Sequence, residues 1–184
     1  MPARGERKEQ LTGNESLLSE KHARLVMQDA KAYLRQYGGI PATLLMNLND
    51  GKQLRLPLAL PQTHQEKVVY FEILGASVRR LRKEIREAVL LSESWYVEKP
   101  NIDPTLKIAP SKHPNRKEAI TLVGRDHTGQ KSIFALQPFG RDAQQQPLFE
   151  PLQLQQFDGK DPSAVYWVGL LDYLFPVRSN RKHH

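Results

Sequence analysis

Four apolar segments follow one another in the second half of the chain, and only turns and loops separate them. They cover residues 88–97, 119–123, 132–136 and 148–154. Parallel strands need a crossover of about a dozen residues, usually a helix, whereas antiparallel strands can follow one another through turns. The order of these segments therefore predicts an antiparallel sheet.

The first helix is predicted to begin near residues 14–16 and to end at about Tyr37. Gly38-Gly39 followed by Pro41 predicts this end, because glycine accepts the left-handed cap conformation and proline cannot continue a helix. Apolar residues at close to helical spacing predict its buried face, namely Leu18, Leu25, Val26, Ala30, Tyr33 and Leu34.

A hairpin is predicted next, with strands over residues 42–48 and 53–58. Asp50-Gly51 separates the two runs, and both residue types tolerate the positive φ angles of tight hairpin turns. Pro57 lacks a backbone N–H, so it predicts that the second run is an edge strand or ends early.

Two further helices are predicted from their N-terminal signals. Thr63 and Glu66 have the spacing of a capping box, and Asp161-Pro162 combines an N-cap residue with proline at the first helical position. The expected buried residues are Phe71, Leu74, Val78 and Leu81 in the second helix, and Trp167, Leu170, Leu171 and Leu174 in the third.

Together these elements predict one α+β domain over residues 14–177. We expect a mainly antiparallel sheet of about five to six strands, with about three helices packed largely on one face. Residues 1–13 are predicted to form a disordered arm and residues 178–184 a basic tail. Two connections stand out, a long loop over residues 98–115 and a polar loop over residues 138–147.

The composition and the absence of known motifs exclude several kinds of functional site. The chain of 184 residues has no cysteine, which excludes disulfides, thiolate metal sites and a cysteine nucleophile. No phosphate-binding glycine loop, zinc-binding histidine pair or hydrolase nucleophile motif is present, so we expect no cofactor and no bound metal. No apolar run reaches the roughly 20 residues of a membrane helix, and the N-terminus lacks a signal-peptide core, so a cytoplasmic protein is expected.

The candidate site is a cluster at the two ends of the long loop, which we call the loop cluster. It comprises Glu93, Trp95, His113, Arg116 and Glu118. If the strands around the loop pair in antiparallel fashion, Glu93 or Trp95 comes close to Arg116 or Glu118. One interpretation is an acid/base or metal-binding carboxylate pair, as in a hydrolase or nuclease centred on Glu93 and Glu118. The favoured interpretation is a half-buried Glu–Arg pair beside Trp95, because no nucleophile or third ligand is nearby.

The same residues resemble a known pattern. Ser92-Glu93-Ser94-Trp95 and Pro114-Asn115-Arg116-Lys117-Glu118 are similar to a Ser-Glu-x-Trp strand end and a Pro-x-Arg-x-Glu strand start. A loose group of uncharacterised bacterial and phage proteins shares both. The resemblance covers residues 41–137 and implies no known activity, so it adds a class of protein and no mechanism.

Positive charge is concentrated in two internal segments, although the chain as a whole carries +7. Segments 79–86 and 107–117 could bind nucleic acid, through Arg79, Arg80, Arg82, Lys83, Lys112 and Arg116. The simpler explanation is solvation, and cations near a helix C-terminus also favour the helix dipole.

The absence of any catalytic or cofactor motif favours a small non-enzymatic accessory or protein-interaction domain. Its expected contact is an exposed edge strand, in Leu44–Leu60 or in residues 148–156. The nucleic-acid-binding module is the first alternative, and the carboxylate-metal enzyme is the second.

Overall fold

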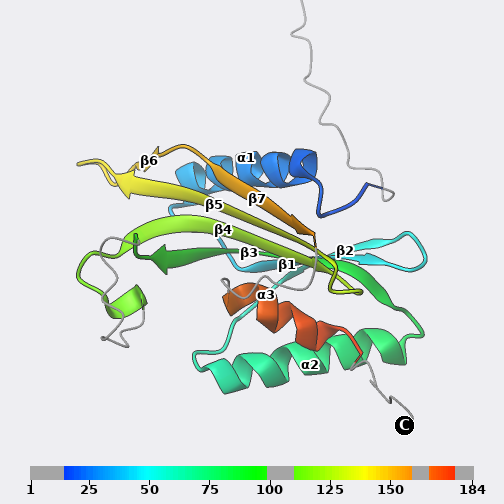
Figure 1. The fold of residues 1–184 in the computed structure, drawn as a ribbon. Coiled ribbons are helices and arrows are strands. Elements are labelled where there is room, and N and C mark those ends of the chain that lie inside the picture. The colour runs from blue at the N-terminus through cyan, green and yellow to red at the C-terminus, as the bar shows by residue number, and fades with distance from the viewer. Residues whose placement is uncertain (1–14, 99–109, 159–165, 177–184) are drawn as a thin grey trace, which may run out of the picture.

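The computed structural model describes residues 15–98, 110–158 and 166–176. Within these ranges it contains a seven-stranded antiparallel sheet and three α-helices, so the predicted α+β class is confirmed (Figure 1). In chain order the elements are α1 Glu20–Tyr37, β1 Thr43–Leu48, β2 Gln53–Pro57, α2 His64–Arg80, β3 Ile85–Tyr96, the 3-10 helix η2 Pro110–Lys112, β4 Lys117–Asp126, β5 Lys131–Arg141, β6 Pro147–Phe149, β7 Gln153–Asp158, α3 Tyr166–Leu171 and the 3-10 helix η3 Asp172–Leu174.

The strands are ordered β2-β1-β3-β4-β5, and both β6 and β7 pair with β5. Each pair is antiparallel. The prediction of a central strand over residues 88–97 is confirmed, because β3 lies between β1 and β4. The predicted hairpin is also present, and β2 ends at Pro57 on the sheet edge.

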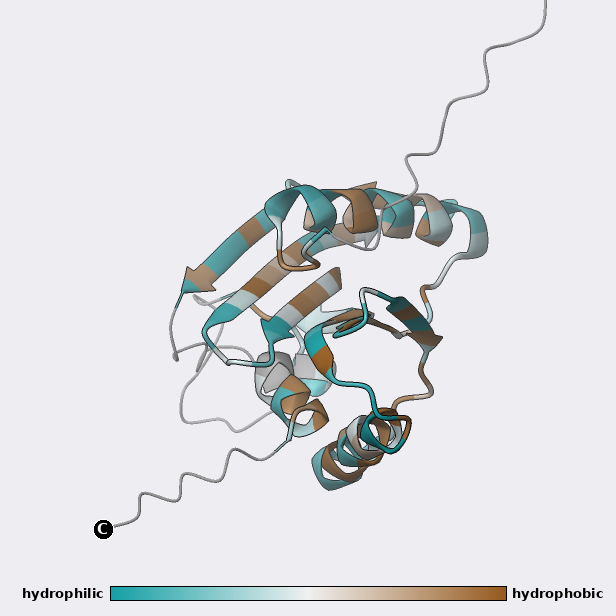
Figure 2. Ribbon diagram, turned by 90° about the vertical axis from the view of Figure 1, so that its right-hand side faces the viewer, coloured by the Kyte–Doolittle hydropathy of each residue, from teal (hydrophilic) through white to brown (hydrophobic). Residues whose placement is uncertain are grey.

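Helices cover both faces of the sheet, so the expectation that they pack largely on one face is wrong. Helix α1 lies on one face, and α2 and α3 lie on the other (Figures 1 and 2). The reason is visible in β3, where Val89 and Leu91 pack toward α1 while Ala88 and Leu90 pack toward α2. A strand that is apolar on both faces needs cover on both.

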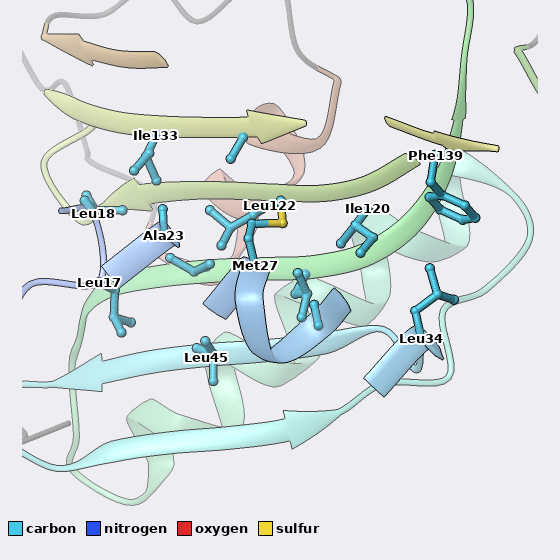
Figure 3. Close-up of a cluster of buried hydrophobic side chains, with 14 residues drawn as sticks. Leu17, Leu18, Ala23, Met27, Leu34, Leu45, Ile120, Leu122, Ile133 and Phe139 are labelled. Atoms are coloured by element: carbon cyan, nitrogen blue, oxygen red, sulfur yellow. The ribbon is translucent and has the colours of Figure 1, made fainter. Parts of the chain in front are cut away.

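The core beneath α1 is formed mainly by contacts between side chains. Figure 3 shows Ala23, Met27 and Leu34 of α1 beside strand residues that include Leu122 and Phe139. The buried members of this core are Leu17, Leu18, Ala23, Met27, Ala30, Leu34, Leu45, Val89, Leu91, Ile120, Leu122, Ile133, Ala135 and Phe139.

The core beneath α2 depends on one close backbone approach. A Cβ atom added at Gly75 would lie 2.2 Å from the carbonyl oxygen of Leu174 in η3. Glycine is therefore required there for α2 and η3 to touch. Phe71 and Val78 bury the same side of α2, and Arg125 Nε lies 2.7 Å from Asp172 Oδ1, which ties η3 to β4.

Two helix predictions need correction. Helix α1 begins at Glu20, later than predicted, because the residues before Ser19 are bonded to the sheet and Ser19 accepts a hydrogen bond from the His22 N–H. Tyr33 and Leu81 were expected to be buried, but both are exposed. The Tyr33 ring instead contacts the Tyr37 ring in a tilted arrangement, with ring centroids 4.4 Å apart. The capping box of Thr63 and Glu66 is confirmed.

The last strands also differ from prediction. Strand β5 continues to Arg141, through residues predicted to be a loop. The predicted strand over residues 148–154 is two strands, β6 and β7, separated at Glu150–Leu152. Helix α3 is present, with Leu170, Leu171 and Leu174 in the core as expected. Its predicted start at Asp161-Pro162, the arm over 1–13 and the tail over 178–184 lie outside the described residues.

Candidate functional site

The register of β3 and β4 brings the loop cluster together only in part. Trp95 lies opposite Glu118, which is one of the contacts that the antiparallel prediction allowed. Glu93 lies two residues before Trp95, so Glu93, Trp95 and Glu118 share one face of the sheet. It is the face that α1 covers, because the next residues along it, Leu91 and Ile120, belong to the α1 core.

Glu118 forms a half-buried ion pair with Arg141, a residue that the sequence analysis missed. Arg141 Nε is 3.1 Å from Glu118 Oε2, and Arg141 Nη2 is 3.5 Å from Glu118 Oε1. The same Nη2 donates to the Gly38 carbonyl at 3.4 Å, and the guanidinium lies over Phe139. The expected pair of a loop-cluster glutamate with Arg116 is therefore wrong, because Glu118 pairs with Arg141 of β5 and Arg116 contacts Trp95 and Ser111 instead.

Glu93 binds the same end of α1. Its Oε1 accepts a hydrogen bond from the backbone N–H of Ile40. Glu93 and Glu118 thus hold consecutive parts of the segment that follows α1, Glu93 directly and Glu118 through Arg141. Both carboxylates are engaged in anchoring a helix end to the sheet.

The remaining members of the cluster form a separate group beside β3. The Arg116 guanidinium lies 4.6 Å from the centre of the Trp95 ring, and it also donates to the Ser111 carbonyl. His113 Nδ1 accepts from the Asn115 N–H at 3.1 Å and so shapes the turn into β4. Among the described residues, no hydrogen bond joins His113 to Glu93 or Glu118.

This geometry does not favour the carboxylate-metal alternative. In residues 15–98, 110–158 and 166–176, no three His, Asp or Glu side chains are grouped so as to hold a metal ion. Glu93 and Glu118 share a face, as that alternative required, yet each is bound to a different structural partner. The alternative stays a prediction without a third ligand in the described part of the chain.

A hollow of about 500 Å³ lies at the opposite end of the sheet and was not predicted. Its polar walls include Asn47, Glu87 and Asp126. Glu87 accepts hydrogen bonds from Ser16 Oγ at 2.7 Å, from the Leu17 N–H at 2.8 Å and from Asn47 at 3.1 Å. Glu87 therefore holds the start of α1 as Glu93 and Glu118 hold its end.

Asp126 lies directly opposite Glu87 on the neighbouring strand. Its carboxylate accepts from the Gln130 and Lys131 N–H groups at 2.9 and 3.0 Å, and from Thr128. Burial raises the pKa of Asp126, but these hydrogen bonds outweigh burial and hold the pKa below its ordinary value. Asp126 is thus committed to the β4–β5 turn.

His22 is the other polar group that the sequence analysis missed. It is 1% exposed, and neither ring nitrogen has a hydrogen-bond partner among the described residues. Burial lowers the pKa of His22, against the attraction of Glu15 and Glu87. Its position on the inner side of α1, next to Ala23, could have predicted burial, although histidine itself gives no such signal.

The two basic segments lie at opposite ends of β3. Residues 79–84 precede its first residue, Ile85, and residues 110–116 lie between its end and the start of β4. A strand of 12 residues spans roughly 40 Å, so the two segments do not form one continuous surface. The nucleic-acid alternative predicted such a surface, and it stays a prediction that rests on each segment separately.

The individual basic residues also differ in their contacts. Arg79 donates to the Leu174 carbonyl at 3.0 Å, and Lys83 lies 2.7 Å from Asp50. Lys112 is exposed on η2. Arg80 and Arg82 are exposed, and their side chains have no hydrogen-bond or ion-pair partner among the described residues. Part of the charge at this helix end is therefore structural, and part is available for a contact.

The outer side of α2 carries an exposed stripe, defined by Glu66, Val69, Ile73, Ser77 and Arg80. Val69 is 47% exposed and Ile73 is 59% exposed. Glu66, Ser77 and Arg80 are exposed as well. We call this surface the α2 stripe. Exposed aliphatic side chains in a row on one helix are a feature of contact surfaces.

The sheet edges are less open than predicted. Strand β2 is an edge, but it has only five residues and carries the exposed Arg55 and Pro57. Charged residues and proline are what edge strands carry when they resist pairing with another strand. On the other side, β7 pairs only with β5 among the described strands, and its residues 153–156 fall in the expected edge segment 148–156.

Comparison with known proteins gives no family: no family model, curated protein or solved structure matches this chain. The resemblance of the loop cluster to bacterial and phage proteins therefore stays a prediction. In the described part of the chain, none of the helices is both long and apolar enough to cross a membrane.

Proposed function

We propose that this chain is a non-enzymatic protein-interaction domain and that its contact surface is the α2 stripe. The observation that carries the proposal is the exposure of Val69 and Ile73 on a helix whose opposite side is fully occupied. Phe71, Gly75 and Val78 already bury that opposite side against the sheet and η3. Packing within the described part of the chain therefore does not account for the exposed apolar side chains on the outer side of α2.

Two contrasts within the molecule support the choice of this surface. The loop cluster has its carboxylates bound to the end of α1, so its charged groups serve the fold. Strand β2 is short and ends in proline, which disfavours strand addition. The α2 stripe combines apolar side chains with Arg80, a residue type enriched in binding hot spots.

Site-specific photo-crosslinking tests the proposal. A photoreactive amino acid replaces Ile73 in the full chain, and the matched control places it at Gln28, an exposed position on α1. We expect a discrete adduct with one protein from position 73 in the cells that produce this chain, and no such adduct from position 28. We further expect Val69→Asp to abolish that adduct. The same adducts from both positions, or none from position 73, would refute the proposal.

A further inference from the structure

We propose that the α2 stripe binds the α2 stripe of a second copy of this chain, with the two helices antiparallel and crossing at Ile73. This inference rests on the proposed function, because it names the occupant of the same surface. It makes the protein a homodimer related by a two-fold axis, the commonest symmetry of protein oligomers.

The stripe is a single narrow row on the helix. Successive residues of an α-helix are rotated by roughly 100°, so Glu66, Val69, Ser77 and Arg80 all lie within about 40° of Ile73. The buried residues Phe71, Gly75 and Val78 lie on the opposite side. One helix could therefore contact the whole stripe at once.

The charges of the stripe are arranged symmetrically about Ile73. Glu66 comes seven residues before Ile73, and Arg80 comes seven residues after it. In an antiparallel pair that crosses at Ile73, Glu66 of each copy meets Arg80 of the other copy. A two-fold contact repeats every pair, so two opposite-charge contacts flank a central contact between the two Ile73 side chains.

The same arrangement of charges favours the antiparallel orientation of the two α2 helices. Parallel helices in register would place Arg80 against Arg80 and Glu66 against Glu66, and like charges at contact distance repel. The antiparallel arrangement converts both contacts to attraction. Val69 then lies against the small Ser77 of the second copy, which lets the helices approach closely.

Both charged groups are available for the contact. The Arg80 side chain has no hydrogen-bond or ion-pair partner among the described residues. Glu66 uses Oε2 to accept from the Thr63 N–H at 3.1 Å and from the Thr63 hydroxyl at 2.8 Å. Its Oε1 accepts no hydrogen bond from the described residues, and a carboxylate oxygen has two acceptor positions. The capping box and the intermolecular pair are therefore compatible.

A second copy fits this surface better than an acidic partner or an anionic surface. A wholly acidic ligand would attract Arg80 but would repel Glu66 at the other end of the stripe. A contact through one helix is also small, at the low end of the interface sizes that hold proteins together. The dimer is therefore expected to dissociate on dilution.

The test is charge exchange between two variants of the full chain, followed by sedimentation velocity from about 10 μM to about 1 mM. Glu66→Arg alone places arginine against Arg80 twice, and Arg80→Glu alone places glutamate against Glu66 twice. We expect each variant alone to dimerise at least about tenfold more weakly than the wild type. In a heterodimer of the two variants, both flanking contacts again join an arginine to a glutamate. We therefore expect an equimolar mixture to recover heterodimers with about the wild-type affinity.

Three controls accompany the mixture. Ile73→Asp should abolish dimers, whereas Glu72→Arg, an exposed change beside the stripe, should leave them unaffected. Glu66→Arg removes half of the capping box, so circular dichroism must show that this variant is folded. Recovery in the mixture would itself require a folded Glu66→Arg chain.

The outcomes separate this inference from the proposed function. A wild-type chain that is monomeric at about 1 mM, or a dimer unaffected by Ile73→Asp, overturns the inference. Loss of dimers in both single variants without recovery in the mixture overturns the antiparallel register. An adduct from position 73 with a different protein would refute the second copy as occupant and leave the proposed function standing.

Discussion

Helices α1 and α2 cover opposite faces of one sheet, and they are attached to it in different ways. Polar groups hold α1 at both ends, with Glu87 at its start and with Glu93 and the Glu118–Arg141 pair at its end. Helix α2 is held by close packing, and its nearest approach is the contact of Gly75 with the Leu174 carbonyl.

The C-terminal ends of the two helices also differ, in the backbone conformation of the residue that follows each helix. Helix α1 ends at Tyr37 and is capped by Gly38, whose φ angle of 75° is one that glycine adopts without strain. After α2, Arg82 adopts a φ angle of 57°, which is unfavourable for a residue with a Cβ atom. The comparison predicts that α1 responds to charge and pH, whereas α2 responds to added volume.

The largest expected effect is that of Gly75→Ala. The new methyl group would overlap the Leu174 carbonyl, and overpacking typically costs about 1–3 kcal/mol of the free energy of unfolding. Chemical denaturation measures this cost. The control is Gly169→Ala in α3, where nothing lies within 4 Å of the added Cβ atom. Equal stability of the two variants would show that α2 is not held by this contact.

The next effect concerns the ion pair at the end of α1. Arg141→Met leaves Glu118 half-buried without its partner, and we expect a loss of about 1–2 kcal/mol in the free energy of unfolding. The control is Arg24→Met, which breaks the exposed pair of Arg24 with Glu20. That change should cost less than about 0.5 kcal/mol. If Arg24→Met lowers the free energy of unfolding as much as Arg141→Met does, the Glu118–Arg141 pair contributes no more than an exposed surface pair.

The smallest effect is pH-dependent and arises at His22. Because the pKa of His22 is lowered by burial from 6.5, the unfolded chain takes up a proton before the folded chain does. Stability is therefore independent of this group above pH 6.5 and falls as the pH drops below that value. The fall ends where the folded His22 also titrates, and for one proton its slope cannot exceed about 1.4 kcal/mol per pH unit.

Denaturation between about pH 5 and pH 7 measures this dependence. His22→Leu should flatten the curve, because leucine fills a similar volume and does not titrate. The control is His113→Gln, since His113 is only partly buried and lies at the turn before β4. A wild-type slope that survives in His22→Leu would assign the proton uptake to another group.

Several local features were predicted correctly because neighbouring residues determine them. The capping box of Thr63 and Glu66, the helix end at Gly38 and the hairpin at Asp50-Gly51 each depend on residues only a few positions apart. Antiparallel pairing on either side of the long loop was also predicted, but the register that places Trp95 opposite Glu118 was one of several that it allowed.

Arg141, the partner of Glu118, was not predicted, because residues 138–147 were expected to form a polar loop. Pro138, at the start of that segment, also argues against a strand. Proline lacks the N–H that a strand normally donates. Here that N–H is not needed, since Pro138 lies where the neighbours of β5 change from β7 to β6, and its carbonyl accepts from the Glu150 N–H at 2.9 Å. Strand β5 therefore continues and brings Arg141 to Glu118.

Periodicity and turn chemistry are local, so the α+β class, the antiparallel pairing and most helix and strand positions could be predicted from the sequence. The placement of α1 and α2 on opposite faces, and the anchoring of α1 by the two carboxylates of the loop cluster, follow from long-range packing. Arg141 and Gly38 are 103 residues apart in sequence, yet they are in hydrogen-bond contact. Such contacts depend on how the whole sheet is assembled, and no local pattern encodes them.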